Sequence, residues 1–239
     1  MIIPHHPAEG GNFCDFSRHN NEKERLIEIY SVWGCSERSS KEGNMFPVRE
    51  EKREGFVQRA LELGWQVGFT AGSDEHRGHP GDMITSPGTA MPYKGGLLAV
   101  LAKVNTREDI WDALWNRRCY GTTGARILTE FKVNENMLGS IVHVSSTNPA
   151  ASCRKIRSEI LGTAALKSVE LIRNNKVIYA VNPGKRNYLL SYNDTEPPDR
   201  TSLPSTTFCD TPFTFYYLRV TQIDNEMAWI SPVWFQFSR

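Results

Sequence analysis

Residues 67–81, VGFTAGSDEHRGHPG, place an acid and two histidines directly after an apolar run. Asp74 and His76 follow this run and the glycine at position 72. A carboxylate and an imidazole two residues apart suit a divalent transition metal such as Zn, Mn or Fe. Asp-x-His can equally cap the element that follows it, and we expect His79, within GHPG, to shape a turn rather than bind metal.

Two further segments carry ligand types next to apolar runs. His5 and His6 follow the short run MIIP, and Glu28 lies within LIEIYS, with Glu37 a few residues later. In a parallel α/β architecture, the loops after the strands converge at the carboxyl ends of the sheet. We therefore expect the three segments to meet at one end of one sheet, although His-His-Pro also suits a loop and Glu28 also suits an exposed strand edge.

The first half of the chain alternates strand-like and helix-like segments. Strands are predicted over 26–33, 67–73 and 96–104, and the segment REGFVQRALELGW has the apolar spacing of a helix. The clearest helix is TREDIWDALWNRR, which Thr106 can cap with Asp109 three residues on. This alternation predicts an α/β unit with a mostly parallel sheet over residues 1–128.

The second half has a different pattern. From Thr129 onward, five or more short strand-like runs without a convincing helix predict a β-sandwich-like, all-β region over residues 129–239. Asn174 and Asn175 lie between two apolar runs and predict a hairpin turn. The aromatic side chains of FTFYYLRV alternate in the way a buried strand face requires, so we expect core packing rather than a carbohydrate platform.

Composition narrows the class of protein. The 239 residues include 28 basic and 27 acidic residues, and the net charge of +1 argues against a general nucleic-acid or membrane-surface binder. No apolar run reaches the ~18 residues that a membrane helix needs. The start MIIPHHPAEG lacks the pattern of a signal peptide, which makes a cytoplasmic location the default expectation. The five cysteines contain no C-x-x-C pair, so a zinc-finger interpretation fails.

Two arginines are candidates for contact with an anionic small-molecule substrate. Arg126 follows the turn YGTTG, whose backbone N–H groups could grip an anion while the guanidinium binds it, which makes Arg126 a candidate catalytic or substrate-binding residue. The same stretch can be an ordinary turn followed by a structural arginine. Arg77 adjoins the Asp-x-His motif and could bind the substrate or simply be solvated.

Several stretches resemble the PHP (polymerase and histidinol phosphatase) superfamily, in particular a bacterial branch catalogued as a domain of unknown function. The resemblance is carried by IIPHHPA, IEIYSVWGCSE, GFTAGSDEHRGHPG and GGLLAVLAKVNTREDIWDALWNRRCYGTTGARI, and again by the tail YYLRVTQIDNEMAWISPVWF. It implies a distorted β/α barrel that hydrolyses phosphate esters through metal-bound hydroxide. It also implies that the metal ligands include Asp74, His76 and one of His5 and His6, with Glu28 and Glu37 as weaker candidates.

The chain departs from the superfamily pattern at its start. The superfamily opens with a His-x-His strand and further ligands, all upstream of the motif at which this chain begins. We therefore expect a partial barrel, completed by a missing N-terminal segment of the same protein, and enough ligands for one metal rather than a cluster.

The resulting hypothesis is that the chain forms part of a metal-dependent, phosphoesterase-like hydrolase, whose activity is expected to depend on the missing N-terminal segment. The alternatives are amide or lactone hydrolysis at the same metal, and a non-catalytic binding or packing module with a vestigial metal site.

Overall fold

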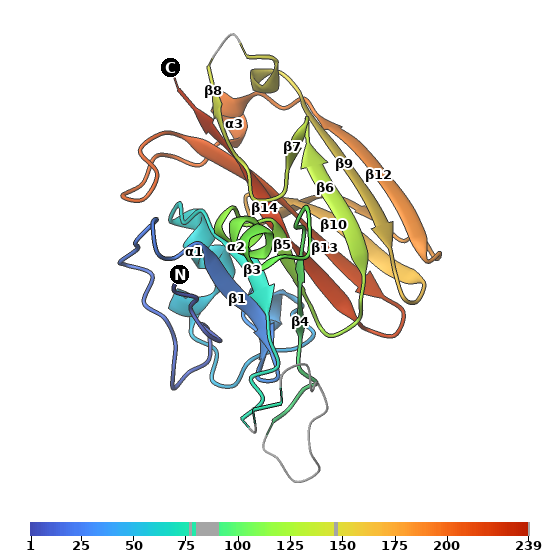
Figure 1. Ribbon diagram of the computed structural model, residues 1–239. Helices are drawn as coiled ribbons and strands as arrows, with labels where there is room; N and C mark the ends of the chain where they lie inside the picture. Colours follow the sequence, from blue (N-terminus) through green and yellow to red (C-terminus); the bar gives the residue numbers. More distant parts are fainter. Residues whose placement is uncertain (77, 80–90, 146–147, 239) are drawn as a thin grey trace.

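The computed structural model describes residues 1–76, 78–79, 91–145 and 148–238. Strands dominate these residues and form three sheets, as Figure 1 shows. The smallest sheet has the order β2-β1-β3 and contains β1 (Leu26–Ser31), β2 (Gly34–Cys35) and β3 (Gly68–Ala71). Strands β1 and β3 are parallel, with Glu28 opposite Thr70.

A seven-stranded sheet forms the centre of the molecule, with the order β11-β10-β13-β14-β5-β4 and with β8 paired to β14. Its long strands β13 and β14 are antiparallel, whereas β8 pairs with β14 in parallel. The members of this sheet are β4 (Leu97–Val100), β5 (Cys119–Thr122), β8 (Ile141–Val144), β10 (Leu166–Arg173), β11 (Lys176–Val181), β13 (Phe213–Gln222) and β14 (Met227–Phe237).

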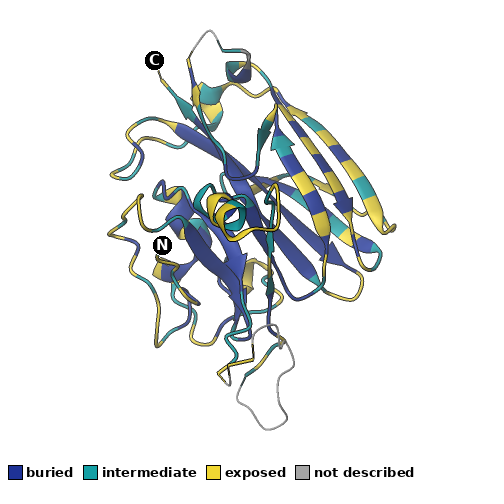
Figure 2. Ribbon diagram, in the orientation of Figure 1, coloured by how far each residue is buried: buried dark blue, intermediate teal, exposed yellow. Residues whose placement is uncertain are grey.

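A four-stranded antiparallel sheet, ordered β12-β9-β6-β7, completes the fold. Along β9 buried and exposed residues alternate strictly, so this sheet has one buried and one solvated face (Figure 2). Its strands are β6 (Leu128–Val133), β7 (Asn136–Met137), β9 (Arg154–Leu161) and β12 (Asn187–Asp194).

Helices are short. They are α1 (Val57–Glu62), α2 (Arg107–Trp115) and α3 (Pro198–Thr201), with single 3₁₀ turns at Ser40–Glu42, Arg53–Gly55 and Pro149–Ala151. Thr106 caps α2 by accepting a hydrogen bond from the backbone N–H of Asp109, as the sequence predicts. No helix in the described part of the chain has the length and apolar character needed to cross a lipid bilayer.

The long strands of the central sheet are buried on both faces: every residue of β13 is buried, and so are the first nine residues of β14. Phe213, Phe215 and Tyr217 pack in one hydrophobic cluster with the small sheet and α1. Tyr216 and Leu218 point the opposite way, into a second cluster shared with the four-stranded sheet. The alternation of aromatic residues in this strand therefore serves two cores, one on each side of the central sheet.

The β-sandwich-like arrangement predicted for the second half is confirmed. The four-stranded sheet packs on the central sheet through the second cluster. The hairpin predicted at Asn174 and Asn175 joins β10 to β11, and both residues have the positive φ that a tight hairpin turn requires. Lys185 and Arg186 lead into β12, which pairs with β9 at the edge of the four-stranded sheet.

The prediction of a partial, distorted β/α barrel of PHP type is wrong. In the described residues only β1 and β3 form the predicted parallel pair, and strands are far more abundant than helices. The segments on either side of α2 form the antiparallel pair β4–β5, with Leu97 opposite Thr122, instead of a parallel crossover. Helical and strand propensities are local, whereas the direction in which two strands pair depends on distant packing.

The boundary predicted between residues 128 and 129 stays a prediction. The structure shows that β4 and β5, which precede this boundary, belong to the same sheet as β14.

Candidate metal centre

Three side chains converge at one end of the small sheet. His5, His6 and Asp74 each offer one ligand atom, and these atoms all lie within 4.8 Å of one another. The Oδ2 atom of Asp74 lies 3.2 Å from Nε2 of His5 and 3.9 Å from Nε2 of His6. Two ligands of a tetrahedral zinc ion are about 3.3 Å apart, given bond lengths of about 2.0–2.2 Å. The separation between Asp74 and His5 matches this value, and the longer separation to His6 would have to shorten for one ion to bind all three side chains.

The small sheet positions these residues. Asp74 follows the end of β3 by three residues, and β3 runs parallel to β1. The segment 1–4, the apolar run before His5, has no regular secondary structure. It nevertheless runs beside β1, because the backbone N–H of Glu28 donates to the carbonyl of Pro4 at 3.0 Å. This contact brings His5 and His6 to the edge where Asp74 lies.

Two of the candidate ligands have unusual backbone conformations. His6 has φ +25° and Asp74 has φ +49°, values in the left-handed region that favours glycine. Each such residue costs on the order of 1–3 kcal/mol, and residues of this kind cluster at functional sites. Two of the three converging residues therefore have backbone conformations of this kind.

Glu28 orients His5. Its Oε2 atom lies 2.7 Å from Nδ1 of His5 and also accepts the backbone N–H of His6 at 2.9 Å. This hydrogen bond raises the pKa of the His5 imidazole, in opposition to burial. With the proton on Nδ1, the lone pair of Nε2 faces Asp74. Gly72 leaves room for the carboxylate, since a Cβ at that position would lie 3.2 Å from Oε1 of Glu28.

Glu9 stands in a similar relation to His6. Its Oε2 atom lies 3.6 Å from Nδ1 of His6, which is too long for a hydrogen bond, and both side chains are buried. The Nδ1 atom of His6 is buried without a hydrogen-bond partner in the described structure. Sequence reasoning missed Glu9, which follows His6 by three residues in HHPAE and becomes informative only through this contact.

Two further side chains contact the carboxylate of Asp74. Trp33 donates its indole N–H to Oδ2, and Nε2 of His76 lies 3.1 Å from Oδ1. His76 is an exposed side chain and is not one of the three converging residues. Its predicted role as a metal ligand stays a prediction, and so does that of Glu28, whose Oε2 atom already serves His5 and His6.

Glu37 lies in a buried ion-pair network instead of the centre. Its Oε1 atom accepts hydrogen bonds from Tyr217 at 2.8 Å and from Arg219 at 2.7 Å, and its Oε2 atom accepts one from Trp229 at 2.9 Å. These donors lie on β13 and β14. The contacts join the segment after β2 to the central sheet and give Glu37 a structural role.

The turn before Arg126 binds a carboxylate of the protein itself, that of Glu226. The carboxylate of Glu226 accepts from the Thr123 hydroxyl at 2.6 Å and from the Ala125 backbone N–H at 3.2 Å, and it pairs with Lys94 at 2.6 Å. Arg126 is exposed beside this turn, so its predicted role as a catalytic or substrate-binding residue stays a prediction. Arg77 lies outside the described residues.

Comparison with known proteins finds relatives of unknown function. A family model described as "Protein of unknown function (DUF3604)" matches residues 68–147. Uncharacterized proteins of Chlamydia muridarum (strain MoPn / Nigg) and Chlamydia pneumoniae are 35% and 38% identical to this chain over 238 and 241 residues. Each alignment covers 98% of this chain and 38% of the relative, so the chain spans well under half the length of these proteins.

A search of solved structures finds a weak similarity to the CARDB domain of a Pyrococcus furiosus protein in complex with di-metal ions. The TM-score is 0.27 at 13% sequence identity, and the match covers 47% of this chain and 93% of that domain. A similarity this low supports no argument about the present chain.

The resemblance to the PHP superfamily is corrected by these findings. The family model that matches is DUF3604, and the described residues form no β/α barrel. The coarser expectation, a domain of unknown function with a β-sandwich-like region, is confirmed. The chain is thus similar to a family without an assigned activity.

Proposed function

We propose that this chain carries part of a metal-dependent hydrolase in which His5, His6 and Asp74 hold one divalent ion of Zn, Mn or Fe. The observation that carries the proposal is the convergence of their three ligand atoms within 4.8 Å. Three protein ligands leave a coordination position open, which is the arrangement of catalytic rather than structural zinc sites. A divalent ion held there acts as a Lewis acid and lowers the pKa of a water molecule toward neutrality.

The charges around the centre support a divalent cation. Asp74, Glu9 and Glu28 contribute three carboxylates, all largely buried, and Arg49 pairs with Glu9 at 3.1 Å. With neutral histidines, these four charged groups leave a formal charge of −2. Buried charges are costly unless they are paired, and a divalent cation would supply the missing countercharge.

The surrounding side chains have positioning roles in this proposal. Glu28 fixes the tautomer of His5 and turns its Nε2 atom toward Asp74. Carboxylates that accept the remote N–H of a ligating histidine raise its basicity and fix its ring. Glu9 would do the same for His6 after a small movement that shortens their 3.6 Å separation. Trp33 holds the carboxylate of Asp74 through Oδ2.

The proposed substrate is a small anionic phosphoester. Amide and lactone hydrolysis use the same kind of metal centre, so the activity assay below compares all three substrate classes. A non-catalytic module with a metal site predicts metal binding without hydrolysis of any of the three substrate classes.

The first experiment measures bound metal in the purified protein and in the Asp74→Ala variant. We expect about one equivalent of divalent metal in the wild type and less than about a tenth of that in the variant, because a site with three ligands loses one of them. His143→Ala is the matched control, since His143 is exposed on β8. Equal metal content in the wild type and Asp74→Ala would contradict the proposal.

Activity is measured with the metal-loaded protein on p-nitrophenyl phosphate, a chromogenic amide and a lactone. Hydrolysis of the phosphate ester that disappears in Asp74→Ala and persists in His143→Ala supports the phosphoesterase assignment. Metal binding without any hydrolysis would instead favour the binding module.

A further inference from the structure

We infer that Arg49 is the residue that recognises the anionic group of the substrate at the metal centre, an inference that rests on the proposed function. Arg49 lies in the loop before the 3₁₀ turn Arg53–Gly55, and nothing in the sequence pattern singles it out. Its side chain is 55% exposed, whereas those of Asp74 and Glu9 are 12% and 10% exposed. It is thus a cation at the surface next to a buried, acidic centre.

Two contacts hold the guanidinium in place. The Nη2 atom lies 3.1 Å from Oε1 of Glu9, and the guanidinium carbon lies 4.3 Å from the centroid of the Trp33 ring. The ring supports the guanidinium through a cation–π contact, and Glu9 engages one of its nitrogens. A guanidinium has five N–H donors, so these contacts leave hydrogen-bonding capacity for an incoming anion.

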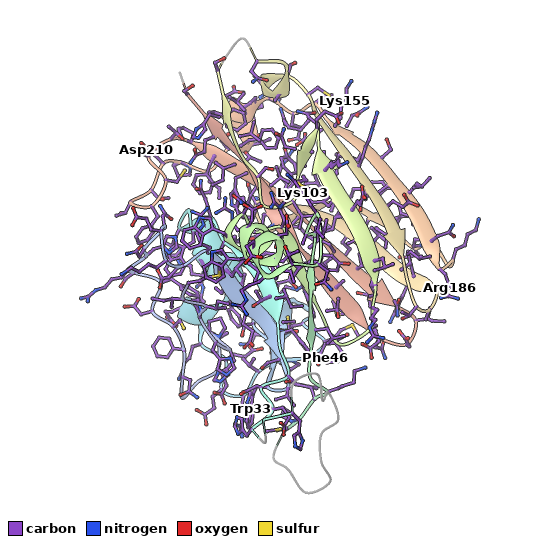
Figure 3. All side chains as sticks on the ribbon, viewed as in Figure 1. Trp33, Phe46, Lys103, Lys155, Arg186 and Asp210 are labelled. Atoms are coloured by element: carbon purple, nitrogen blue, oxygen red, sulfur yellow. The ribbon has the colours of Figure 1, made fainter. Side chains whose placement is uncertain are left out.

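Both supports of Arg49 also touch a candidate metal ligand. Trp33 donates its indole N–H to Oδ2 of Asp74, and the other carboxylate oxygen of Glu9 lies 3.6 Å from Nδ1 of His6. The guanidinium is therefore linked to the candidate ligands through one intervening side chain in each case, Trp33 toward Asp74 and Glu9 toward His6. Figure 3 shows Trp33 at the same end of the molecule as the termination of β3.

The backbone fixes the position of Arg49 as well. The N–H of Gly10 donates to the carbonyl of Arg49 at 3.1 Å, which joins the loop to the segment that carries His5 and His6. A Cβ on Gly10 would lie 2.4 Å from Cβ of Glu50, so only glycine permits this approach. The arginine is therefore placed beside the centre by the same segment that supplies two of the metal ligands.

This geometry selects the chemical class of the substrate. The planar fork of an arginine matches a phosphate or carboxylate through two parallel hydrogen bonds, whereas a lysine offers a point charge. A guanidinium already stacked on an indole loses little conformational freedom when an anion binds. The centre would bind the reacting end of a phosphoester while Arg49 binds its non-bridging oxygens.

The test is a titration of the purified 239-residue chain with inorganic phosphate, with the metal content of the same sample measured separately. The variants are Arg49→Gln, which removes the charge, and Arg49→Lys, which keeps the charge but not the fork. Arg53→Gln is the matched control, because Arg53 is exposed four residues away and the change in net charge is the same. We expect the Kd for phosphate to rise at least tenfold in Arg49→Gln, to rise by a smaller factor in Arg49→Lys, and to stay unchanged in Arg53→Gln.

Four outcomes would overturn the inference. The first three are a wild-type protein that does not bind phosphate, an Arg49→Gln variant that binds it as the wild type does, and an equal loss in Arg53→Gln. If Arg49 only neutralised Glu9, Arg49→Lys would bind phosphate with the wild-type Kd, and this too would contradict the inference. A failure of the proposed metal site is detected by a different measurement. It appears as equal metal content in wild type and Asp74→Ala, whereas the inference about Arg49 is tested by the ratio of the phosphate Kd values.

Discussion

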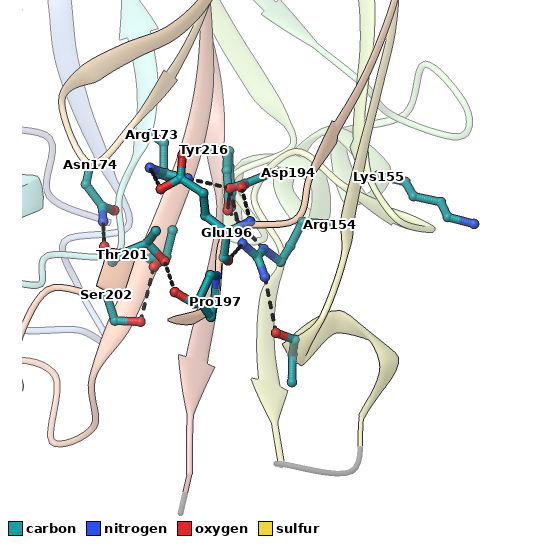
Figure 4. A network of polar contacts seen from close by, with 12 residues as sticks. Arg154, Lys155, Arg173, Asn174, Asp194, Glu196, Pro197, Thr201, Ser202 and Tyr216 are labelled. Carbon is teal, nitrogen blue, oxygen red and sulfur yellow. Dashed lines mark hydrogen bonds and ion pairs between the residues drawn. The ribbon is translucent and has the colours of Figure 1, made fainter. Parts of the chain in front are cut away.

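Two aspartates of this protein lie in polar clusters of opposite character. Asp194, at the end of β12, is 1% exposed and is surrounded by Arg154, Arg173 and Tyr216 (Figure 4). Its Oδ2 atom lies 3.2 Å from Nη2 of Arg154, 2.8 Å from Nη1 of Arg173 and 2.5 Å from the Tyr216 hydroxyl. Together with Glu196, which pairs with Arg173 at 3.1 Å, two carboxylates face two guanidiniums and the cluster is formally neutral.

Asp74 has neighbours of a different kind. Its nearest nitrogen atoms belong to imidazoles and to an indole, none of which is permanently charged. The carboxylates of Glu9 and Glu28 lie behind the histidines, and Arg49 is the only guanidinium that the structure places in contact with these acids in its described part. His6 and Asp74 also have strained backbones.

The difference separates a cluster that is compensated within the fold from one that we propose to bind a metal ion. A buried carboxylate among guanidiniums is compensated permanently and stabilises the fold. A buried carboxylate among imidazoles is compensated only when a proton or a metal ion is present, so its stability depends on what is bound. Three predictions test this comparison.

The largest effect is expected from Asp194→Ala. The change leaves Arg154, which is 1% exposed, without its buried counterion, and breaking a buried pair in this way costs about 3–5 kcal/mol. Urea denaturation measures the free energy of unfolding. Asp210→Ala, at an exposed position, is the control and is expected to change it by less than about 0.5 kcal/mol. A loss below about 1 kcal/mol in Asp194→Ala would remove the distinction between the clusters.

A smaller effect is expected from Glu28→Gln. The amide cannot accept the His5 Nδ1 proton as strongly as a carboxylate, and loss of such an orienting group weakens metal affinity by about 10–100-fold. Isothermal titration with Zn²⁺ measures the metal affinity of each variant. Glu24→Gln is the control, because Glu24 makes the same kind of contact with His19 at 3.1 Å, away from the centre. Unchanged affinity in Glu28→Gln, or an equal loss in Glu24→Gln, would show that Glu28 does not position His5 for metal.

The smallest effect concerns the pH dependence of stability. Burial alone raises the pKa of Asp194, but hydrogen bonds from Tyr216 and Arg173 outweigh it and hold the pKa below its ordinary value. A group whose pKa is lower in the folded state stabilises the protein above its unfolded pKa, and this contribution is lost as pH falls through the folded pKa. We expect the free energy of unfolding to fall between about pH 5 and pH 2, and to fall less steeply in Asp194→Asn. Identical slopes would contradict the lowered pKa.

Local features of the fold could be predicted from the sequence, and its sheet topology could not. The cap at Thr106 and the turn at Asn174 and Asn175 depend on neighbouring residues, so they are visible in the sequence. The pairing of β4 with β5 depends on packing against β14, which lies more than a hundred residues later. Strand and helix alternation alone therefore suggested a parallel barrel that does not form.

The candidate centre shows the same division. The types and spacing of His5, His6 and Asp74 suggested a shared site, and the structure brings these three residues together. Glu9 and Arg49 were missed because acids and arginines are common at surfaces and become informative only through their contacts. The exact arrangement depends on the loop of residue 49 docking against Gly10, a contact between distant parts of the chain.

The buried carboxylate of Glu37 has a consequence for how the layers can move. Donors on both long central strands, Tyr217 and Arg219 on β13 and Trp229 on β14, meet on its two oxygens. A displacement of the segment that follows β2, which carries Glu37, relative to the central sheet would disturb all three hydrogen bonds at once, among side chains that are buried. This segment is thereby anchored to both long strands of the central sheet, so a movement of the small sheet against the central sheet would cost buried hydrogen bonds.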